Sequence, residues 1–393
     1  MMRIAAVISE FNPFHNGHRF FIDSVRKKLG DDTCIIALMS GNYTQRGEVS
    51  IADKFTRAAS AIHGGVDLVL EIPFPYSASS AEFFARAGVF IADALSIVDT
   101  LAFGSECGDL ERLTQAAERL CSAEFKEALT VAVEKNPNIG HARITENVFR
   151  HLYGDDGGLL SRPNDILAIE YLRALLALDT KIKPLTVKRL CDYHAKTLAD
   201  GISASSVRKA LMDSDPAAYT AMPEGTRECI KNACEAAHAP ATMSRLGPIL
   251  LSYFRTVTPS EKDDLGHHLK NAAIRATDFD DFLSLTATKR YTHAHLRRAI
   301  WHRYFGVTSA DLYEPPAFTQ VLGMNERGRL ALRQAARCKR IAILTKPADA
   351  RALSGAAARQ ALLSQKADLI YPLAMPVPVP GNFFILSAPY RNI

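Results

Sequence analysis

Short apolar runs alternate with amphipathic stretches through roughly the first half of the chain. The runs have the composition of strands buried in a parallel sheet: IAAVIS (4–9), CIIALMS (34–40), DLVLEI (67–72), IVDTLAF (97–103) and the weaker IKPLTVKRL (182–190). Apolar residues recur every three or four positions between them, which predicts helices over HRFFIDSVRKKL (18–29), ADKFTRAASAIHG (52–64), SAEFFARAGVFIADAL (80–95) and NDILAIEYLRALLAL (164–178). This alternation predicts an α/β fold, a doubly wound, Rossmann-like domain with a parallel sheet that binds ligands at the carboxyl ends of its strands.

The pattern changes after about residue 208. Residues 211–340 have helical spacing interrupted by prolines and few strand-like runs, so they predict a mostly helical second domain. The tail returns to strand-like pieces, which would pair as a small sheet or complete the first domain: RIAILT (340–345), ADLIYPL (367–373) and NFFILSAPY (382–390). We therefore expect a first domain over 1–210 and a second over 211–393.

Composition narrows the class of protein. The 393 residues suffice for two domains with cores of their own, and 47 Lys and Arg against 42 Asp and Glu permit a polyanionic partner without requiring one. The 7 cysteines are scattered and form no C-x-x-C pair, which argues against a disulfide framework or a zinc ribbon. No apolar segment approaches the roughly 20 residues of a membrane span, and the N-terminus lacks the features of a signal peptide. We expect a cytoplasmic protein.

The stretch SEFNPFHNGHRFF (9–21) places two histidines where the first predicted strand passes into a helix. A histidine at a helix N-terminus can donate its Nε2–H to a phosphate oxygen, where the helix N–H groups and dipole already favour an anion. Gly17 allows a nucleotide close to the backbone. The alternative is a polar turn in which His15 and His18 are incidental. No Walker-type motif is present, so this would be a different way of holding ATP.

A second candidate anion site lies in GISASSVRKAL (201–211). Hydroxyl groups of Ser203, Ser205 and Ser206 precede Arg208 at a predicted helix start, where hydroxyls, backbone N–H groups and a guanidinium bind anions well. The alternative is an ordinary serine N-cap followed by a solvated arginine. The pairing with the histidine motif favours the anion site.

These two motifs together resemble the nucleotidyltransferase superfamily, which includes the class I aminoacyl-tRNA synthetases. Six blocks, from residue 10 to beyond 320, resemble one family, the bacterial tRNA(Met) cytidine acetate ligases: EFNPFHNGH, SGNYTQRGEVSIADKFTRAASAIHGGVDLVLEIPF, LAFGSECGD, SRPNDILAIEYLRAL, TKRYTHAHLRR and VLGMNERG. The resemblance implies that acetate is adenylated by ATP, accompanied by Mg²⁺, and that the acetyl group passes to N4 of the wobble cytidine, position 34, of elongator tRNA(Met).

The resemblance also assigns residues. His15 and His18 would be catalytic and stabilise charge at the α-phosphorus. The ATP-binding positions would be Val7, Ile8, Ser9, Glu10, Phe11, Asn12, Pro13, Phe14, His15, Asn16, Gly17, His18, Arg19, Phe20, Gly104, Asn164 and Arg189, joined by Ser205, Ser206 and Arg208. Asn164 would bind ribose or a base edge, or cap the helix after Pro163.

The polar loop SGNYTQRGE (40–48) follows a strand, so Gln45 and Arg46 are expected on the substrate side. Lys54 and Arg57 in the next helix are expected to be solvated. No protein ligands for a metal are predicted, and the sequence does not indicate the acetate-binding residues or the oligomeric state.

One segment of the second domain, TATKRYTHAHLRRAIWHRY (286–304), is rich in cations and has no acidic residue. Leu296, Ile300 and Tyr304 would seat one helix face on a core. The basic side chains would then bind tRNA phosphates, namely Lys289, Arg290, Arg297 and Arg298. The alternative is a solvated basic helix. We expect relatives to carry arginine where this chain has His293 and His295, which would weaken the contact.

Three rival functions come from other classes. A small-molecule adenylyltransferase of cofactor metabolism would need neither a large helical domain nor a basic helix. A non-catalytic tRNA-binding protein would not need an intact His-x-Gly-His motif. An acetyltransferase that uses acetyl-CoA would need a coenzyme A pyrophosphate loop, and we see none in the sequence.

Overall fold

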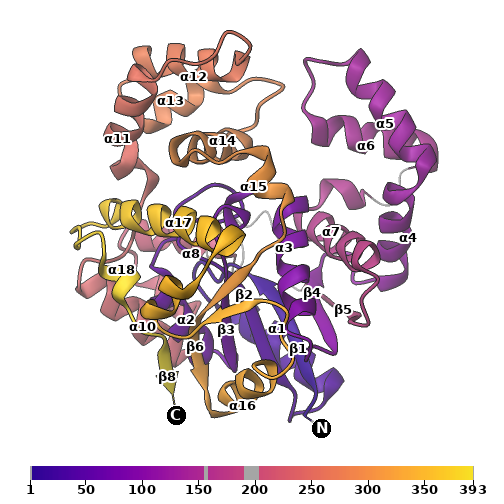
Figure 1. Cartoon of the computed structure of the whole chain (residues 1–393), viewed down its shortest axis with the longest axis vertical. Helices are drawn as coiled ribbons and strands as arrows, with labels where there is room; N and C mark the ends of the chain where they lie inside the picture. Colours follow the sequence, from indigo (N-terminus) through magenta and orange to yellow (C-terminus); the bar gives the residue numbers. More distant parts are fainter. Residues whose placement is uncertain (1, 155–157, 190–202, 393) are drawn as a thin grey trace.

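An eight-stranded sheet forms the centre of the computed structural model, which describes residues 2–154, 158–189 and 203–392 (Figure 1). The strand order is β5-β4-β1-β2-β3-β6-β7, and β8 pairs with β6. The strands are β1 (Ile4–Ser9), β2 (Cys34–Ser40), β3 (Leu68–Ile72), β4 (Thr100–Ser105), β5 (Lys183–Lys188), β6 (Phe318–Asn325), β7 (Ala342–Leu344) and β8 (Tyr390–Asn392). The predicted parallel sheet is confirmed for β1 to β5.

The order of the first five strands creates a switch point beside β1. The chain leaves β1 for β2 and β3 on one side and returns to β4 and β5 on the other. Ligands of such sheets bind in the crevice outside the carboxyl ends of the strands at this point. The histidine motif follows β1, and Gly104 lies near the end of β4.

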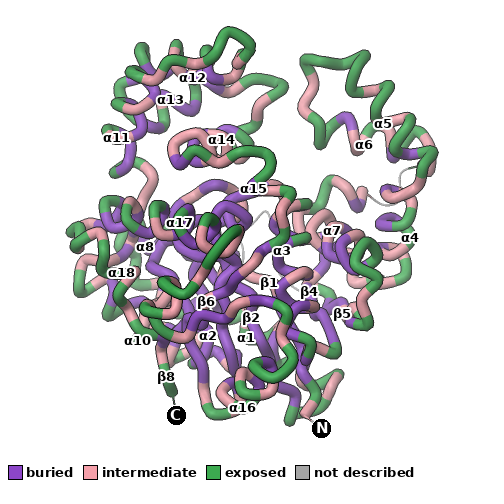
Figure 2. Tube along the Cα trace, viewed as in Figure 1, coloured by how far each residue is buried: buried purple, intermediate pink, exposed green. Residues whose placement is uncertain are grey.

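Helices cover both faces of the sheet because successive strand residues point to opposite sides. Ala5, Ile35 and Ala37 pack against α1 (Asn16–Leu29) and α2 (Lys54–His63) on one face. Ile4, Ile36 and Leu70 face the opposite layer, which consists of α3 (Ala81–Ala94), α4 (Leu110–Cys121), α7 (Pro163–Leu178) and α16 (Glu326–Ala335). Figure 2 shows the strands and these inner surfaces as the most deeply buried part of the molecule.

Most of the remaining helices lie toward the sheet edge that carries the strands' carboxyl ends, whereas the helix at 224–235 packs on α2. Helices α5 (Ala123–Lys135) and α6 (His141–Tyr153) form an outlying hairpin on one side. A second core joins α11 (Met243–Thr256), α12 (Asp264–Arg275), α13 (Phe279–Thr286), α14 (His293–Phe305) and α17 (Gly355–Ile370). The others are α8 (Ala204–Met212), α9 (Ala217–Thr220), α10 (Glu224–Glu235), α15 (Ser309–Tyr313) and α18 (Phe383–Leu386), with 3-10 turns at Tyr76–Ala78, Leu159–Ser161, Pro347–Ala352 and Tyr371–Ala374.

The end of the chain returns to the first sheet. Strand β6, which lies within the stretch interpreted as helical, pairs antiparallel with β3, and β7 and β8 pair with β6. The tail therefore completes the first sheet, so the expected boundary at residue 210 does not separate the sheet from the second half. Among the described residues, no helix is long and apolar enough to cross a membrane.

Three expected strands differ from the structure. The fourth strand begins at Thr100, because Ile97 and Val98 pack on the core from the preceding turn. The piece at 367–373 is the end of α17 and a 3-10 turn, and the piece at 382–390 contains the short helix α18 and only the first residue of β8. Leu190, Gly201 and Ile202, which belong to predicted segments, lie outside the described residues.

Candidate functional site

A cleft of about 680 Å³ opens at the switch point of the sheet. It lies between the ends of β1 and β4, the first turns of α7 and α8, and the N-terminal half of α14. Its lining includes many predicted residues: Val7, Ile8, Ser9, Glu10, Phe11, Asn12, His15, Gly17, His18, Gln45, Arg46, Gly104, Asn164, Arg189, Ser205, Arg208 and Arg298. The two candidate anion sites, about 190 residues apart in the sequence, thus meet in one cleft.

Hydrogen bonds from the backbone fix the tautomers of the two histidines. His15 is the N-cap of α1, and its Nδ1 accepts from the Gly17 N–H at 3.0 Å, while Nδ1 of His18 accepts from the His15 N–H at 3.2 Å. A neutral imidazole that accepts at Nδ1 carries its proton on Nε2. Each ring therefore retains one Nε2–H donor in the cleft.

Burial keeps both histidines uncharged. Burial, with Arg189 and Arg208 adding to it, lowers the pKa of His15 to about 3. Burial and the neighbouring His15 lower the pKa of His18 well below its ordinary value. At neutral pH the rings are donors without a positive charge, and the charge of the cleft comes from the arginines.

Of the other residues in the segment 7–20, some line the cleft and others pack into the core. Phe11 has a φ of 43°, a conformation that non-glycine residues seldom adopt and that is common at functional sites. Its buried ring lies edge-on to His18, with the ring centroids 5.1 Å apart.

Six predicted ATP-binding residues lie outside the cleft lining: Pro13, Phe14, Asn16, Arg19, Phe20 and Ser206. Phe14 packs under Gly64, Arg19 pairs with Asp23, and Phe20 is exposed. Phe14 precedes α1 and enters the core, whereas Arg19 and Phe20 lie on α1 outside the cleft lining, so proximity in sequence does not make these residues a surface of the cleft.

Two arginines line the second side of the cleft. Arg208 donates to the Asn12 carbonyl at 2.9 Å and to Ser205 Oγ at 3.3 Å. Within the described residues, Nε of Arg189 is buried and has no hydrogen-bond partner. The absence of a side chain at Gly104 leaves room for Arg189, because a Cβ there would lie 3.2 Å from its Cγ. Ser203 and Ser206 form a capping box at the start of α8, so the N-cap interpretation holds for these two serines.

The sequence analysis missed the carboxylate that holds Asn164. Glu106 accepts from the Asn164 side-chain amide at 2.6 Å and from the backbone N–H groups of Asn164 and Asp165. Asp165 in turn accepts from the Glu106 and Cys107 N–H groups. Asn164 is therefore not the N-cap of α7, which is Arg162. The polar run SECGD (105–109), which contains Glu106 and follows a predicted strand, was the signal in the sequence that could have pointed to this carboxylate.

Comparisons with known proteins agree with this geometry. The sequence pattern of the HIGH Nucleotidyl Transferase family matches residues 2–380. The chain is 33% identical over 362 residues to the tRNA(Met) cytidine acetate ligase of Caldanaerobacter subterraneus subsp. tengcongensis, covering 88% of this chain and 90% of that protein. The corresponding ligase of Anoxybacillus flavithermus is 34% identical over 349 residues, covering 85% and 86%. The chain belongs to the tRNA(Met) cytidine acetate ligase family.

Solved structures support the same assignment. The crystal structure of Thermotoga maritima TmcAL bound with alpha-thio ATP has a TM-score of 0.89 and 26% identity, covering 99% of this chain and 100% of that one. The apo form has a TM-score of 0.90 and 25% identity, covering 100% of both chains. The chain is an enzyme of this ligase family with the nucleotidyltransferase fold.

In this family member, α14 contacts the loop at 40–48. Arg297 Nε donates to the Arg46 carbonyl at 3.2 Å, Arg298 Nη1 to the Gln45 carbonyl at 3.3 Å and Trp301 Nε1 to the Gly47 carbonyl at 3.0 Å. A Cβ on Gly47 would lie only 2.6 Å from the Arg298 nitrogen. Helix α14 therefore braces the loop against the cleft.

The basic side chains of this segment divide into two groups. Arg297 also pairs with Glu48 at 3.2 Å, and Arg298 is half-buried in the cleft wall, so neither is a simply solvated side chain, and their contact with tRNA stays a prediction. Lys289 and Arg290 are exposed in the preceding turn. The expected apolar face is confirmed for Leu296 and Ile300, but Tyr304 is only half-buried, and Trp301 and Phe305 complete the face.

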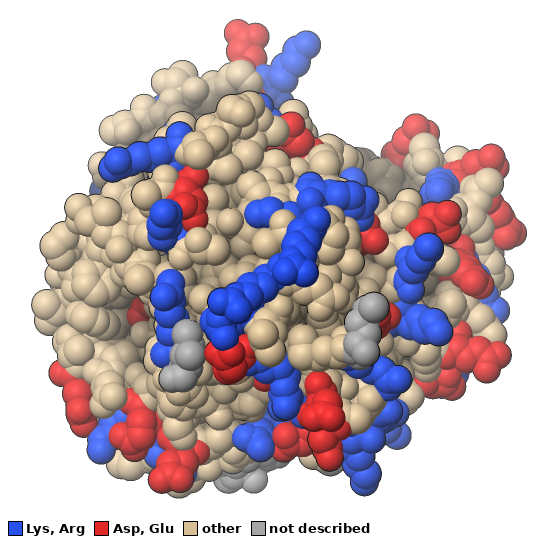
Figure 3. All heavy atoms as spheres, turned by 60° about the horizontal axis from the view of Figure 1, so that its bottom comes forward, with Lys and Arg blue, Asp and Glu red and all other residues tan. Residues whose placement is uncertain are grey.

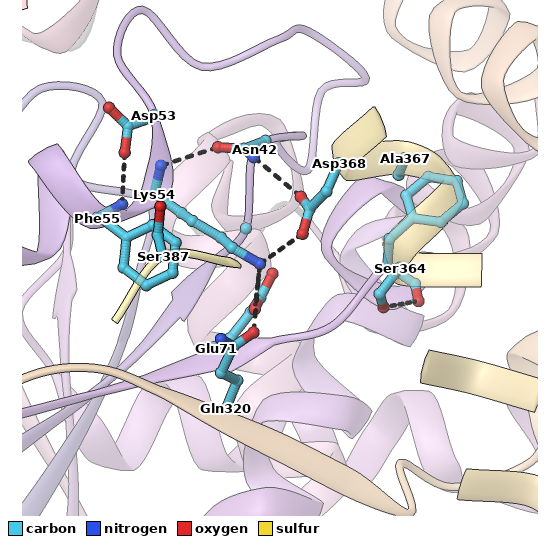
Figure 4. Close-up of polar contacts among 12 residues, drawn as sticks. Asn42, Asp53, Lys54, Phe55, Glu71, Gln320, Ser364, Ala367, Asp368 and Ser387 are labelled. Atoms are coloured by element: carbon cyan, nitrogen blue, oxygen red, sulfur yellow. Dashed lines mark hydrogen bonds and ion pairs between the residues drawn. The ribbon is translucent and has the colours of Figure 1, made fainter. Parts of the chain in front are cut away.

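The first turn of α2 holds a buried ion cluster, which corrects the expectation that Lys54 and Arg57 are solvated. Lys54 Nζ lies 2.8 Å from Glu71 and 2.7 Å from Asp368, and Asn42 bonds both to Asp368 and to the Lys54 N–H (Figure 4). Although burial alone would lower it, the two carboxylates hold the pKa of Lys54 above its ordinary value. The cluster ties the start of the loop at 40–48 to α17.

The neutral state of His15 predicts acid sensitivity of the nucleotide-free enzyme. An unfolded histidine titrates near 6.5 and the folded His15 near 3, so the unfolded state takes up this proton first. The contribution of His15 to the free energy of unfolding is therefore present above pH 6.5 and is lost as the pH falls toward 3. His15→Asn, which keeps a capping oxygen, should make the unfolding free energy less steep between pH 5.5 and 4, by about 1.4 kcal/mol per pH unit. Urea unfolding measures this slope, and equal slopes would contradict the buried neutral ring.

Proposed function

We propose that this chain is an ATP-dependent ligase that activates acetate as acetyl-adenylate and transfers the acetyl group to N4 of the wobble cytidine, position 34, of elongator tRNA(Met). The observation that carries the proposal is the convergence of His15, His18, Arg189 and Arg208 with two helix N-termini at the switch point. This arrangement supplies neutral donors, positive charge and helix dipoles to a polyphosphate. The family membership supplies the identity of the substrates.

The first step needs charge stabilisation at the α-phosphorus. An acetate oxygen attacks this phosphorus, the bond to the β-phosphate oxygen breaks, and pyrophosphate leaves. The Nε2–H groups of His15 and His18 would donate to phosphoryl oxygens that gain charge, and Arg189 and Arg208 would bind the departing pyrophosphate. Because the rings stay neutral, they contribute oriented dipoles and no change in net charge.

The second step needs the cytidine close to the bound acetyl group. N4 attacks the acetyl carbonyl carbon, the bond to the AMP oxygen breaks, and a proton leaves N4. Gln45 and Arg46 lie on the loop that lines the cleft, so we assign them to the substrate side. The brace from α14 holds the backbone of this loop through the Gln45 and Arg46 carbonyls, which leaves the two side chains to the cleft.

Magnesium would accompany the nucleotide. The described residues contain no group of three or more His, Cys, Asp or Glu able to hold a metal ion, but Mg²⁺ needs only one or two carboxylates beside phosphate oxygens. Glu10 and Glu48 line the cleft and fit that requirement. When bound, Mg²⁺ would neutralise phosphate charge.

The tRNA would approach over the N-terminal end of α14. Lys289 and Arg290 are exposed and would contact phosphates, whereas Arg297 and Arg298 would act mainly through the loop and the cleft. His295 stacks on Tyr291, and burial lowers the pKa of His295, so this histidine adds no charge at neutral pH.

The two-step reaction predicts activity without tRNA. Purified protein with ATP and acetate should catalyse acetate-dependent ATP–pyrophosphate exchange and form bound acetyl-adenylate from labelled acetate. Adding tRNA(Met) should release AMP and yield N4-acetylcytidine, and coenzyme A should not stimulate the reaction.

Each rival has its own outcome in this assay. Strict dependence on acetyl-CoA would indicate the acetyltransferase route, and exchange with a different acid would indicate a small-molecule adenylyltransferase. Binding of tRNA without any exchange would indicate a non-catalytic protein. Any of the three would contradict the proposal.

A further inference from the structure

A stripe of arginines lies on α16 and the turn that follows it, which we call the α16 stripe: Arg329, Arg333, Arg337 and Arg340. Residues 329–340, RLALRQAARCKR, contain no acidic side chain. Spacings of four and three residues place these arginines along one side of a helical path. Figure 3 brings this end of the molecule forward and shows a diagonal band of lysine and arginine side chains across it.

The opposite face of α16 is fixed firmly to the protein. Gly328, Ala331 and Ala335 are buried, and a Cβ on Gly328 would lie only 1.9 Å from the Asp67 carbonyl oxygen. Asn325 caps the helix by accepting from the Gly328 N–H at 2.9 Å and donates to Asp67 at 2.9 Å. Small residues and a side-chain cap therefore hold the helix on the sheet, and packing does not require the arginines.

The two ends of the stripe have carboxylate partners, whereas its middle has none among the residues that the structure describes. Arg329 pairs with Glu326, and Arg340 pairs with Asp93. Arg333 and Arg337 are exposed, and within the described residues no carboxylate forms an ion pair with either of them. Two neighbouring exposed arginines without an ion-pair partner among the described residues are available to an anion supplied from outside the chain.

The stripe is remote from the cleft. Helix α16 contacts the start of β3 through Asp67, whereas the cleft lies at the carboxyl ends of the strands. Strand β2 has 7 residues, and at about 3.3 Å per residue the two edges of the sheet are roughly 20 Å apart. A ligand of the stripe is therefore distinct from the nucleotide.

The chemistry of the surface favours RNA over an acidic protein. Protein interfaces bury an apolar centre, but the only large hydrophobic side chain exposed on α16 within the described residues is Leu330. Arg329 and Arg333, four residues apart on α16, are separated by about 6 Å along the helix axis, a spacing that suits successive phosphates of one strand. A surface of cations without an apolar centre is typical of contacts with a phosphate backbone.

We propose that the α16 stripe is a second RNA-binding surface, which holds phosphates of the tRNA at a distance from the nucleotide that enters the cleft. This inference rests on the proposed function, since it takes the same tRNA as the ligand. The stripe contributes affinity and orientation of the RNA body and takes no part in the chemistry.

Removal of the two unpaired charges tests the stripe. Arg333→Ala/Arg337→Ala should weaken binding of full-length tRNA(Met) and lower the slope of log affinity against log salt by about two units, one for each lost phosphate contact. The isolated anticodon stem-loop should lose less affinity and less salt slope than the full-length tRNA, because it lacks the phosphates of the RNA body. Acetate-dependent ATP–pyrophosphate exchange should also stay unchanged.

A matched control is Lys231→Ala/Lys366→Ala, which removes two exposed charges from α10 and α17 and should leave the salt slope as in the wild type. An unchanged slope in the stripe variant, or an equal loss for full-length tRNA and the stem-loop, would overturn the proposal. Failure of the unaltered protein to bind any tRNA would instead reject the proposed function.

Discussion

His15→Asn and His18→Asn are each expected to lower the rate of acetate-dependent pyrophosphate release by about 10²-fold or more, mainly in kcat. Asparagine places an amide oxygen where Nδ1 lies, so the hydrogen bonds within the first turn of α1 can persist. What is lost is the Nε2–H donor, which acts on charge that develops only in the transition state. Steady-state kinetics with ATP and acetate, without tRNA, measure the effect.

The matched control for these variants is His141→Asn. This histidine is exposed at the start of α6, outside the cleft, and its replacement should leave pyrophosphate release unchanged. Thermal unfolding of all three variants would separate lost chemistry from lost folding. A His15→Asn/His18→Asn double variant that retains its rate within a few-fold would end the interpretation of this motif as a phosphate site.

Lys54→Met is expected to lower the free energy of unfolding by about 3–5 kcal/mol, the usual cost of removing one partner of a buried ion pair. The side chains of Glu71 and Asp368 are only 4% and 9% exposed, so neither can turn to water when Lys54 is lost. Urea unfolding at pH 7 measures the loss. Lys231→Met, at a half-exposed position on α10, should change stability by less than about 0.5 kcal/mol.

The pH dependence of the Lys54→Met variant gives a second test. Burial raises the pKa of Glu71 even with Lys54 present, and loss of the ammonium group should raise it further. A carboxyl whose folded pKa is raised destabilises the protein at high pH and is relieved by protonation, so the deficit should shrink as the pH falls from 7 toward 5. Glu71→Gln and Asp368→Asn added to Lys54→Met should restore part of the loss. A deficit below about 1 kcal/mol at pH 7 would contradict a buried cluster.

Most of the central sheet could be predicted because its signals are local. Strands β1, β2 and β3 are continuous apolar runs, and α1 to α3 carry clear helical spacing between them. Strand β6 lacked such a signal, since Thr319, Gln320 and Gly323 interrupt its short apolar run. Helix α17 buries the polar residues Gln360, Ser364 and Asp368 and exposes Leu362 and Leu369, so its sequence has no amphipathic pattern to reveal its period.

In the candidate site, too, residues in local motifs could be predicted from the sequence, whereas partnerships between distant residues could not. The histidines and Arg208 stand in short motifs whose chemistry is visible in the sequence. The partnership of Lys54 with Asp368, or of Arg298 with the Gln45 carbonyl, joins residues more than 250 positions apart. A charged side chain looks the same in a sequence whether its partner is water or a buried carboxylate, and only the fold decides between them.

The place of β6 beside β3 has a consequence for synthesis of the protein. β6 begins about 250 residues after β3 ends, so a ribosome that adds 5–20 residues per second supplies it on the order of 10–50 s later. Throughout that interval the nascent sheet presents the unpaired backbone groups of β3 along its edge, which is a template for aggregation. A messenger truncated before codon 318 would leave this edge open permanently, and its product should depend on chaperones in a way that the full-length chain does not.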